Sequence, residues 1–279
     1  MRLNLYDKIS LRCSREVTTG YSTSFSLGIK MLAPRHRNAI YAIYGFVRLA
    51  DEIVDTFFDQ RQREMLDRFR QDTGEAIAGR TSPNPILHSF QWAVNTYSID
   101  REFIDAFFYS MEMDLDQKNH DHKSYGEYIY GSAEAVGLMC LRVFSNDVPG
   151  SFDRLKEPAR KLGSAFQKVN FLRDIGSDYI DRGRMYFPGV DFNRFTVEDK
   201  KLIEDDIAGE FREALKGIRV LDSGSRRGVY LAYSYYLALF AKIRKTPPGA
   251  VTGQRFRISD GRKLLLLVKA IICDITGII

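Results

Sequence analysis

Cysteine, proline and glycine are all scarce in this 279-residue sequence. The three cysteines, Cys13, Cys140 and Cys273, are far apart and odd in number. That pattern favours neither a disulfide framework nor a thiolate metal site, and it is typical of a reducing compartment. Eight prolines and 21 glycines are too few for a protein built mostly of turns and loops.

Long apolar runs are also missing. The first residues contain no stretch of signal-peptide length. The longest apolar segment, residues 264–279, is interrupted by Lys269 and Asp274 and is shorter than the ~20 residues that span a bilayer. We therefore expect a cytoplasmic protein that does not cross a membrane.

The positive charge is concentrated at one end of the chain. The net charge is +5, and residues 240–279 hold eight basic side chains against two acidic ones. Such a tail favours phosphate groups or an anionic membrane surface. No nucleic-acid reading motif accompanies it, so we expect no nucleic-acid partner.

Apolar residues recur at intervals of three and four through most of the sequence, without strand-like alternation, which predicts an all-α fold. We expect helices over residues 35–58, 60–79, 85–97, 101–115, 125–144, 152–181, 197–221, 226–244 and 260–275. Thr196 and Asp199 resemble a capping box. No linker or internal repeat is visible, so residues 1–279 are predicted to form a single all-helical domain.

The helix predicted over residues 35–58 carries a polar stripe on an otherwise apolar surface. Spacings of three and four place five side chains on one face: Tyr41, Tyr44, Arg48, Asp51 and Asp55. A helix that is apolar nearly all round is normally buried. Because an unpaired buried carboxylate is costly, Asp51 and Asp55 need a cation, which is either a neighbouring arginine such as Arg48 or a metal.

A similar stripe follows about 120 residues later. Its members are Gln167, Asn170, Asp174 and Asp178. An isolated pair of aspartates one turn apart is usually an exposed, salt-bridged helix face, but two pairs in comparable surroundings reverse that expectation. If the two faces meet across a cavity, hard divalent ions with oxygen ligands would neutralise them, and Mg²⁺ completes its octahedron with water and phosphate oxygens. The predicted chemistry is ionisation or transfer at a diphosphate.

These segments resemble the squalene/phytoene synthase family of head-to-head prenyl transferases. Its two aspartate-rich motifs are similar to residues 48–55 (RLADEIVD) and residues 167–178 (QKVNFLRDIGSD). Residues 181–188 (DRGRMYFP) and 130–137 (YGSAEAVG) also match the family pattern. The resemblance runs from about Ser22 to Arg255 and is most similar to the bacterial phytoene synthases.

The resemblance implies an isoprenoid-synthase helical bundle around a central apolar cavity with two diphosphate sites. The implied ligands of Mg²⁺, for which Mn²⁺ is an acceptable substitute, are Asp51, Asp55, Asn170, Asp174 and Asp178. The implied catalytic residues are Asp51, Asp55, Tyr130, Arg173, Asp174 and Asp178. The implied substrate-binding residues are Ser22, Ser24, Phe25, Arg48, Gln167, Asn170, Tyr236 and Arg255. Tyr21 stands where relatives often have histidine, which puts the hydrogen bonding at one diphosphate in question.

The implied reaction joins two geranylgeranyl diphosphates through a cyclopropyl diphosphate to give phytoene, a step of carotenoid biosynthesis. The aromatic-lined cavity would shield the cations from water. Squalene or dehydrosqualene formation from farnesyl diphosphate is the alternative. We do not expect NADPH to be required, although the lack of a G-x-G-x-x-G turn decides little.

Two other classes of function stay open. A non-catalytic, membrane-associated relative is disfavoured because all four motif aspartates are present. A terpene cyclase is disfavoured because paired diphosphate elements occur around Ser22 and Arg173. The basic tail either contacts the inner face of a membrane peripherally or is an ordinary soluble helix. The oligomeric state is not predicted.

Overall fold

The regular secondary structure is helical, as expected. The computed structural model describes residues 3–57, 61–117, 119–180, 184–251 and 255–277, without the side chains of residues 177–180 and 193. Within these residues the exception to helical structure is one isolated β-bridge between Asn119 and Met185. The prediction of an all-α fold is therefore confirmed.

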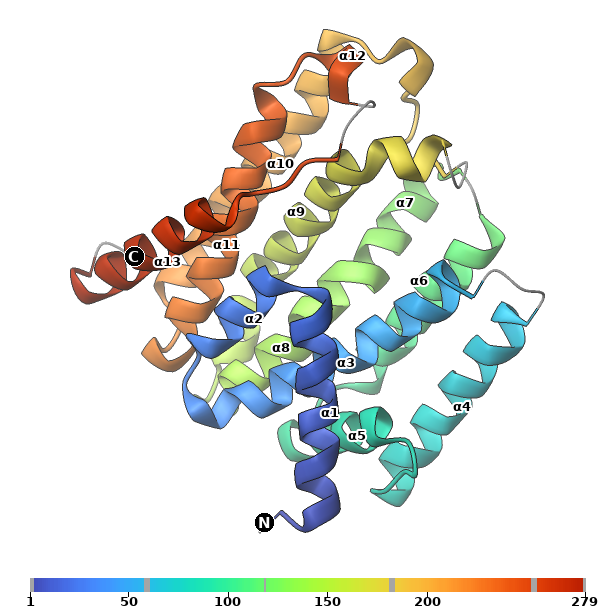
Figure 1. The fold of residues 1–279 in the computed structure, drawn as a ribbon, viewed down its shortest axis with the longest axis vertical. Coiled ribbons are helices and arrows are strands. Elements are labelled where there is room, and N and C mark those ends of the chain that lie inside the picture. The colour runs from blue at the N-terminus through green and yellow to red at the C-terminus, as the bar shows by residue number, and fades with distance from the viewer. Residues whose placement is uncertain (1–2, 58–60, 118, 181–183, 252–254, 278–279) are drawn as a thin grey trace.

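The helices are arranged as shown in Figure 1. The N-terminal half contains α1 (Leu5–Tyr21), α2 (Thr23–Lys30), α3 (Pro34–Asp55), α4 (Gln62–Gly79), α5 (Pro85–Tyr97), α6 (Arg101–Asp116) and α7 (His122–Ile129). A π-helical turn, η1 (Tyr130–Glu134), leads into α8 (Ala135–Ser145). The remainder contains α9 (Ser151–Ile180), the 3₁₀ turn η2 (Phe192–Arg194), α10 (Val197–Arg219), α11 (Ser223–Arg244), α12 (Pro248–Val251) and α13 (Asp260–Ile275).

The predicted helices agree with the order of the observed α-helices except at four places. The helices expected over residues 85–97 and 260–275 coincide with α5 and α13, and Thr196 forms the predicted capping box with Asp199 at the start of α10. The helix expected over residues 125–144 is divided by η1, and α1, α2 and the four-residue α12 were missed. No helix in the described ranges is long and apolar enough to cross a membrane.

Helix α3 lies at the centre of one part of the core and contacts α1, α5 and α8. Its side chain Phe46 is fully buried and stacks on Phe90, with ring centroids 3.8 Å apart. Phe107 and Phe108 of α6 close the other sides of the ring at 5.3 and 5.6 Å. The apolar faces predicted for this helix are therefore buried, and its polar stripe faces the inside of the molecule.

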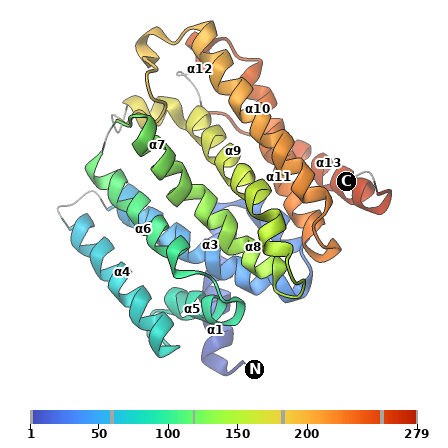
Figure 2. The same ribbon diagram turned by 180° about the vertical axis from the view of Figure 1, so that it is seen from behind.

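Two glycines allow α6 and α9 to approach η1 closely; the view from behind shows α6 and α9 on either side of the segment from α7 to α8 (Figure 2). A Cβ on Gly131 would lie 2.2 Å from the Ala106 carbonyl oxygen of α6, and a Cβ on Gly163 of α9 would lie 2.6 Å from the Ala133 carbonyl oxygen. Any larger residue would force the helices apart. These contacts fix α6 and α9, which both carry acidic residues, against η1.

Candidate functional site

A cavity of about 1410 Å³ lies between α2, α3, α8, α9, α10, α11 and the segment of residues 255–263. Its exposed lining residues, at the mouth, include Tyr21, Thr23, Arg255, Arg257 and Arg262. Most of the predicted site residues line this one cavity, namely Ser22, Ser24, Phe25, Arg48, Asp51, Gln167, Asn170, Arg173, Tyr236 and Arg255. Residues more than 100 positions apart in the sequence are thus brought to the same space.

On the α3 side, Arg48 is held between acidic groups and an aromatic ring. It donates a hydrogen bond to Glu52 and lies 3.7 Å from the Asp51 carboxylate. Its guanidinium stacks 4.2 Å from the centroid of the Tyr21 ring. Its buried Nε has no hydrogen-bond partner among the described residues. Tyr21 therefore positions Arg48 through its ring, and Arg48 keeps a donor available for an anion.

The pKa of the Asp51 carboxyl is raised, and Arg48 opposes this rise only in part. Burial, together with the nearby carboxylates of Asp55 and Asp114, raises the pKa of Asp51 to about 7 against the opposing effect of Arg48. A carboxyl group with this pKa is costly to ionise at neutral pH. Additional positive charge would be stabilised here.

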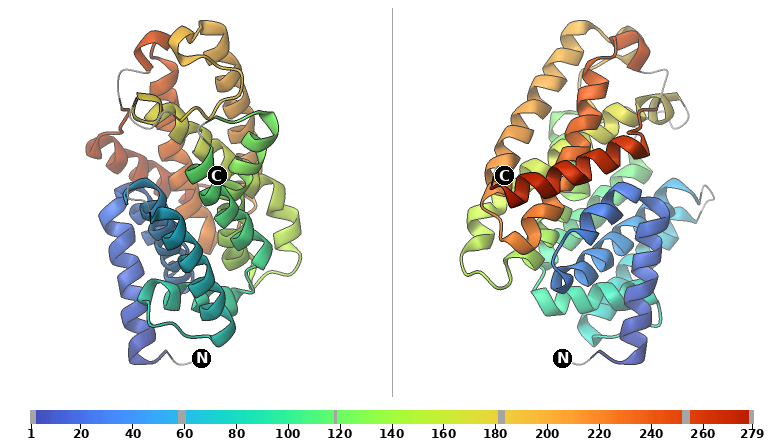
Figure 3. Two further views of the ribbon diagram at one scale, coloured as in Figure 1. Left: turned by 90° about the vertical axis from the view of Figure 1, so that its right-hand side faces the viewer. Right: turned by 60° about the vertical axis from the view of Figure 1, so that its left-hand side comes forward.

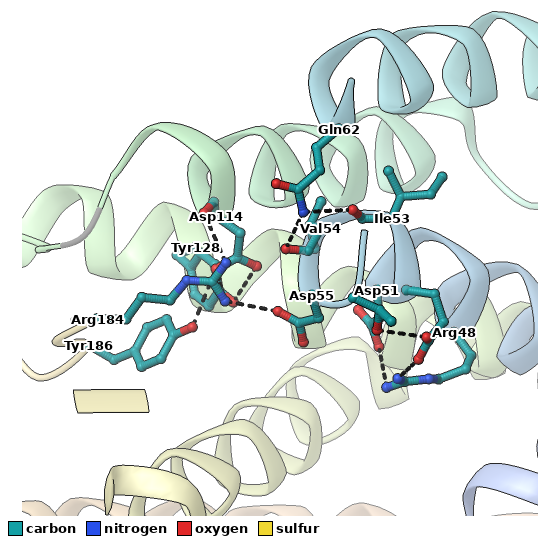
Figure 4. Close-up of polar contacts among 12 residues, drawn as sticks. Arg48, Asp51, Ile53, Val54, Asp55, Gln62, Asp114, Tyr128, Arg184 and Tyr186 are labelled. Atoms are coloured by element: carbon teal, nitrogen blue, oxygen red, sulfur yellow. Dashed lines mark hydrogen bonds and ion pairs between the residues drawn. The ribbon is translucent and has the colours of Figure 1, made fainter. Parts of the chain in front are cut away.

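Asp114, near the end of α6, was not predicted as a site residue, yet it joins this acidic cluster (Figure 4). Its carboxylate accepts hydrogen bonds from the hydroxyls of Tyr128 at 2.9 Å and Tyr186 at 3.3 Å. Arg184 links it to the first motif, donating to the Asp114 carbonyl oxygen and to Asp55, both at 3.0 Å. Burial raises the pKa of Asp114 to about 6.

The sequence contained one weak signal for Asp114. It follows Met111 by three residues and so shares a helix face with a side chain that is buried and lines the cavity. No partner at a fixed spacing marked it, because its partners Arg184 and Tyr186 lie 70 and 72 positions away.

On the α9 side, the polar stripe interacts with α11 and with the C-terminal segment. The Tyr236 hydroxyl donates to Asn170 Oδ1 at 3.2 Å. Asp174 accepts hydrogen bonds from Arg173 Nε at 3.0 Å and from Arg255 Nε at 3.0 Å. Arg255 thus lines the cavity and contacts the second aspartate-bearing helix; its role in substrate binding stays a prediction.

Not every predicted residue reaches the cavity directly. Among the described residues, Asp55 and Asp174 do not line the cavity. Asp55 contacts Arg184. Asp174 contacts Arg173 and Arg255, and both of these arginines line the cavity. The side chain of Asp178, in the last turn of α9, is outside the described residues.

Tyr130, predicted as a catalytic residue, is not among the described residues that line the cavity. Its hydroxyl faces Glu102, at 3.4 Å, and Arg160 lies over its ring. Tyr128 lines the cavity together with Ser132 and other residues that continue its helix face. Because two residues along a helix turn the side chain through roughly 200°, the tyrosine that faces the site is Tyr128.

The donor chemistry fits a hard divalent cation. Carboxylate and amide oxygens are the ligands that Mg²⁺ prefers. Burial raises the pKa values of Asp51 and Asp114, so a nearby cation would favour the ionised form of both carboxyls. Among the residues that the structure describes, no three His, Cys, Asp or Glu side chains are close enough together to hold a metal ion by themselves. Since Mg²⁺ usually keeps several water or phosphate ligands, a complete protein cage is not required.

An aromatic wall lies below the polar residues. It consists of Phe25, Tyr44, Phe166 and Tyr236, all of which line the cavity. Phe166 stacks on Tyr236 with centroids 3.9 Å apart, and Phe25 lies 5.7 Å from Tyr44 and 5.9 Å from Tyr236. These rings contribute a large apolar surface to the cavity.

Comparisons with known proteins agree with this arrangement. Residues 18–262 match the family model described as squalene/phytoene synthase. The 15-cis-phytoene synthase of Synechocystis sp. is 28% identical over 278 residues, covering 91% of this chain and 82% of that protein. The 4,4'-diapophytoene synthase of Staphylococcus haemolyticus is 27% identical over 252 residues, covering 82% and 86%.

The fold has a close counterpart among solved structures. A crystal structure of a dehydrosqualene synthase in complex with ligand superposes with a TM-score of 0.81 at 21% identity, covering 95% of this chain and 96% of that one. The family model spans both aspartate-bearing helices and the cavity between them. The chain belongs to the squalene/phytoene synthase family.

Proposed function

We propose that this enzyme condenses two prenyl diphosphates head to head, with geranylgeranyl diphosphate as donor and acceptor and phytoene as product. The observation that carries the proposal is a single cavity with arginines and acidic helices at its polar end and an aromatic wall below them. Its volume of about 1410 Å³ exceeds the ~300–1,000 Å³ of pockets for drug-sized ligands. Space of this size suits two long prenyl chains.

The polar end is suited to bind diphosphate. Arg48, Arg173 and Arg255 line the cavity and supply guanidinium groups that match phosphate oxygens. Mg²⁺, with Mn²⁺ as a substitute, would be held by Asp51, Asp55, Asn170, Asp174 and Asp178 and would neutralise the charge of the departing diphosphate. Arg184 keeps Asp55 in place through its hydrogen bond.

The proposed reaction has two ionisations. The first donor loses diphosphate, and its C1 cation alkylates the double bond of the second molecule; loss of one proton gives a cyclopropyl diphosphate. That intermediate loses the second diphosphate, rearranges and loses another proton to give phytoene. Because this route consumes no hydride, NADPH is not required. Phe25, Phe166 and Tyr236 line the cavity and would shield the cations from water.

A second donor is supported by one comparison. The Staphylococcus haemolyticus relative, a 4,4'-diapophytoene synthase, matches with nearly the same identity as the Synechocystis enzyme. Formation of dehydrosqualene or squalene from farnesyl diphosphate is therefore the alternative, and squalene alone would need a reductant.

The test is incubation of the purified protein with farnesyl or geranylgeranyl diphosphate, each with and without NADPH, in Mg²⁺ or in EDTA. We expect phytoene from geranylgeranyl diphosphate in Mg²⁺ without NADPH, and no product in EDTA. Asp174→Asn is the control and should form no product while its helical circular dichroism is retained. A cyclic product made from one prenyl diphosphate, or turnover that is indifferent to EDTA, would contradict the proposal.

A further inference from the structure

Helix α13, the dark red helix near the C-terminus, lies on the outside of the molecule (Figure 3). Side-chain hydrogen bonds attach it to α11 near both of its ends. Close to its start, the Tyr235 hydroxyl donates to the carbonyl oxygen of Lys263 at 3.1 Å. Close to its end, the nearly buried Asp274 carboxylate accepts from Arg226 at 3.1 Å and from Arg227 at 2.8 Å. These contacts hold α13 in one orientation on the surface.

Both faces of α13 are apolar. The inner face packs Leu266, Leu267 and Ala270 against Leu231 and Tyr235 of α11. The outer face exposes five further large apolar side chains, with exposed fractions of 46–73%: Leu264, Leu265, Val268, Ile272 and Ile275. At about 100° per residue these five fall within an arc of roughly 100°. We call this surface the outer stripe.

The outer stripe is not what an ordinary surface helix presents. Such a helix directs apolar residues to the core and polar residues to water. A contiguous exposed apolar surface on a soluble protein commonly marks an interaction site. Because the inner face of α13 already has its partner, the outer stripe is available for a second one.

The charges beside the outer stripe identify the kind of partner. Arg262 and Lys269 are exposed along one edge of the stripe, and neither forms an ion pair with any residue in the described ranges. Lys263, by contrast, is occupied by Asp260 and Thr23. Unpaired positive charge next to exposed leucines matches anionic lipid, whose headgroups lie directly above the acyl chains.

A second copy of the chain fits this surface less well. Pairing of identical patches around a two-fold axis puts the same surface of both copies into one interface, with residue i of one copy against residue j of the other. Such an interface would collect four positive charges, from Arg262 and Lys269 of each copy, and would bring no compensating anionic surface. Lipid of opposite charge carries no such penalty.

The position of α13 relative to the cavity also favours lipid as the partner of the outer stripe. Arg262 and Lys263, in the first turn of α13, also line the cavity. A surface in contact with the outer stripe would thus lie next to the cavity mouth. Water-insoluble prenyl chains could pass between the apolar cavity and an apolar layer there without crossing bulk water.

We propose that α13 binds flat on the surface of an anionic lipid bilayer, with the outer stripe among the upper acyl groups and Arg262 and Lys269 at the headgroups. The helix has 16 residues and is therefore about 24 Å long, shorter than the ~30 Å hydrocarbon core. It lies in the interface rather than spanning the membrane.

Co-sedimentation of the full chain with vesicles tests this proposal without any substrate. Vesicles of phosphatidylcholine are compared with an equimolar mixture of phosphatidylcholine and phosphatidylglycerol. We expect binding to the mixed vesicles, weakened by salt, and little binding to phosphatidylcholine alone. Leu265→Glu should reduce vesicle binding about tenfold or more, and Lys269→Gln should reduce it about fivefold.

A matched control is available on α10. Leu202 is 72% exposed, and Lys201 beside it is also exposed; Leu202→Glu and Lys201→Gln make the same chemical changes away from α13. Both should bind vesicles like the wild type. Equal losses at α10 and α13, or binding that ignores lipid charge and salt, would overturn the proposal.

Sedimentation velocity separates lipid binding from self-association. We expect the wild type and Leu265→Glu to have the same sedimentation coefficient without lipid. A wild-type dimer that Leu265→Glu dissociates would assign the outer stripe to a second copy and overturn the proposal. If Leu265→Glu fails to fold by circular dichroism, Lys269→Gln and the salt dependence of the wild type still decide between the outcomes.

Discussion

Replacement of Asp51 by asparagine should stabilise the metal-free protein at neutral pH and abolish turnover. Burial raises the pKa of Asp51 from its ordinary value of 3.8 to about 7. At 1.36 kcal/mol for each pKa unit, this difference lowers the free energy of unfolding at neutral pH by about 4 kcal/mol. Because the side chain is 33% exposed, solvent screening reduces the effect to roughly 2 kcal/mol.

The sign of the pH dependence follows from the direction of the pKa change. A carboxyl whose pKa is raised in the folded state favours folding while it is protonated, and that contribution is lost as pH rises from about 4 to about 7. Asparagine has no proton to lose. The stability advantage of Asp51→Asn should therefore grow over this range and stay constant above pH 7.

Thermal unfolding in EDTA, followed by circular dichroism at pH 5 and pH 8, measures the effect. We expect the Asp51→Asn variant to melt about 4–8 °C above the wild type at pH 8 and by a smaller margin at pH 5. The control Asp205→Asn alters an exposed aspartate of α10 and should not share the pH-dependent gain. Mg²⁺ with inorganic diphosphate should narrow the difference, since it stabilises the wild type. An Asp51→Asn variant that melts at or below the wild-type temperature in EDTA at pH 8 would refute the reasoning.

Three further predictions use matched pairs of variants. Gly131→Ala should lower the free energy of unfolding, measured with urea, by about 1–3 kcal/mol. Gly126→Ala, with open space around its Cβ position, should leave that free energy unchanged or raise it by up to about 1 kcal/mol. Equal effects of the two substitutions would contradict the close approach of the helices at Gly131. Tyr21→Phe should keep the KM for the diphosphate substrate, while Tyr21→Ala should raise it about two- to fivefold because the ring under Arg48 is lost; a raised KM in both would assign the role to the hydroxyl instead. Tyr128→Phe should lower kcat about tenfold or more, and Tyr130→Phe should not; the reverse result would restore Tyr130 to the site.

The polar stripe of α3 was predictable because its evidence is local. Spacings of three and four identify one helix face, and an almost wholly apolar remainder predicts burial. The capping box of Thr196 and Asp199 is likewise contained within four residues. The arginine partner of Asp55 was not predictable in this way, since Arg184 lies 129 positions away.

The missed elements lacked the pattern on which the prediction depended. The buried residues of α1 include small polar ones, such as Ser10, Ser14 and Thr18. Ser14 shares a 2.6 Å hydrogen bond with Ser89 of α5, and it lies where a Cβ on Gly45 would clash. A helix that packs through serine and glycine contacts shows little apolar periodicity.

Helix phase decides which of the two tyrosines, Tyr128 or Tyr130, faces the cavity. The π-helical turn η1 begins at Tyr130, and sequence alone did not show which tyrosine faces inward. The single-domain organisation of residues 1–279, the Mg²⁺ requirement and the geranylgeranyl donor stay predictions.

A crystal structure with Mn²⁺ and a non-hydrolysable prenyl diphosphate analogue tests the central claim most directly. We predict anomalous Mn²⁺ peaks within about 2.5 Å of carboxylate oxygens on both α3 and α9, with the analogue's diphosphate bridging them and its prenyl chain along the aromatic wall. Diphosphate bound only by arginines under saturating Mn²⁺, or Mn²⁺ located outside the cavity, would contradict the account.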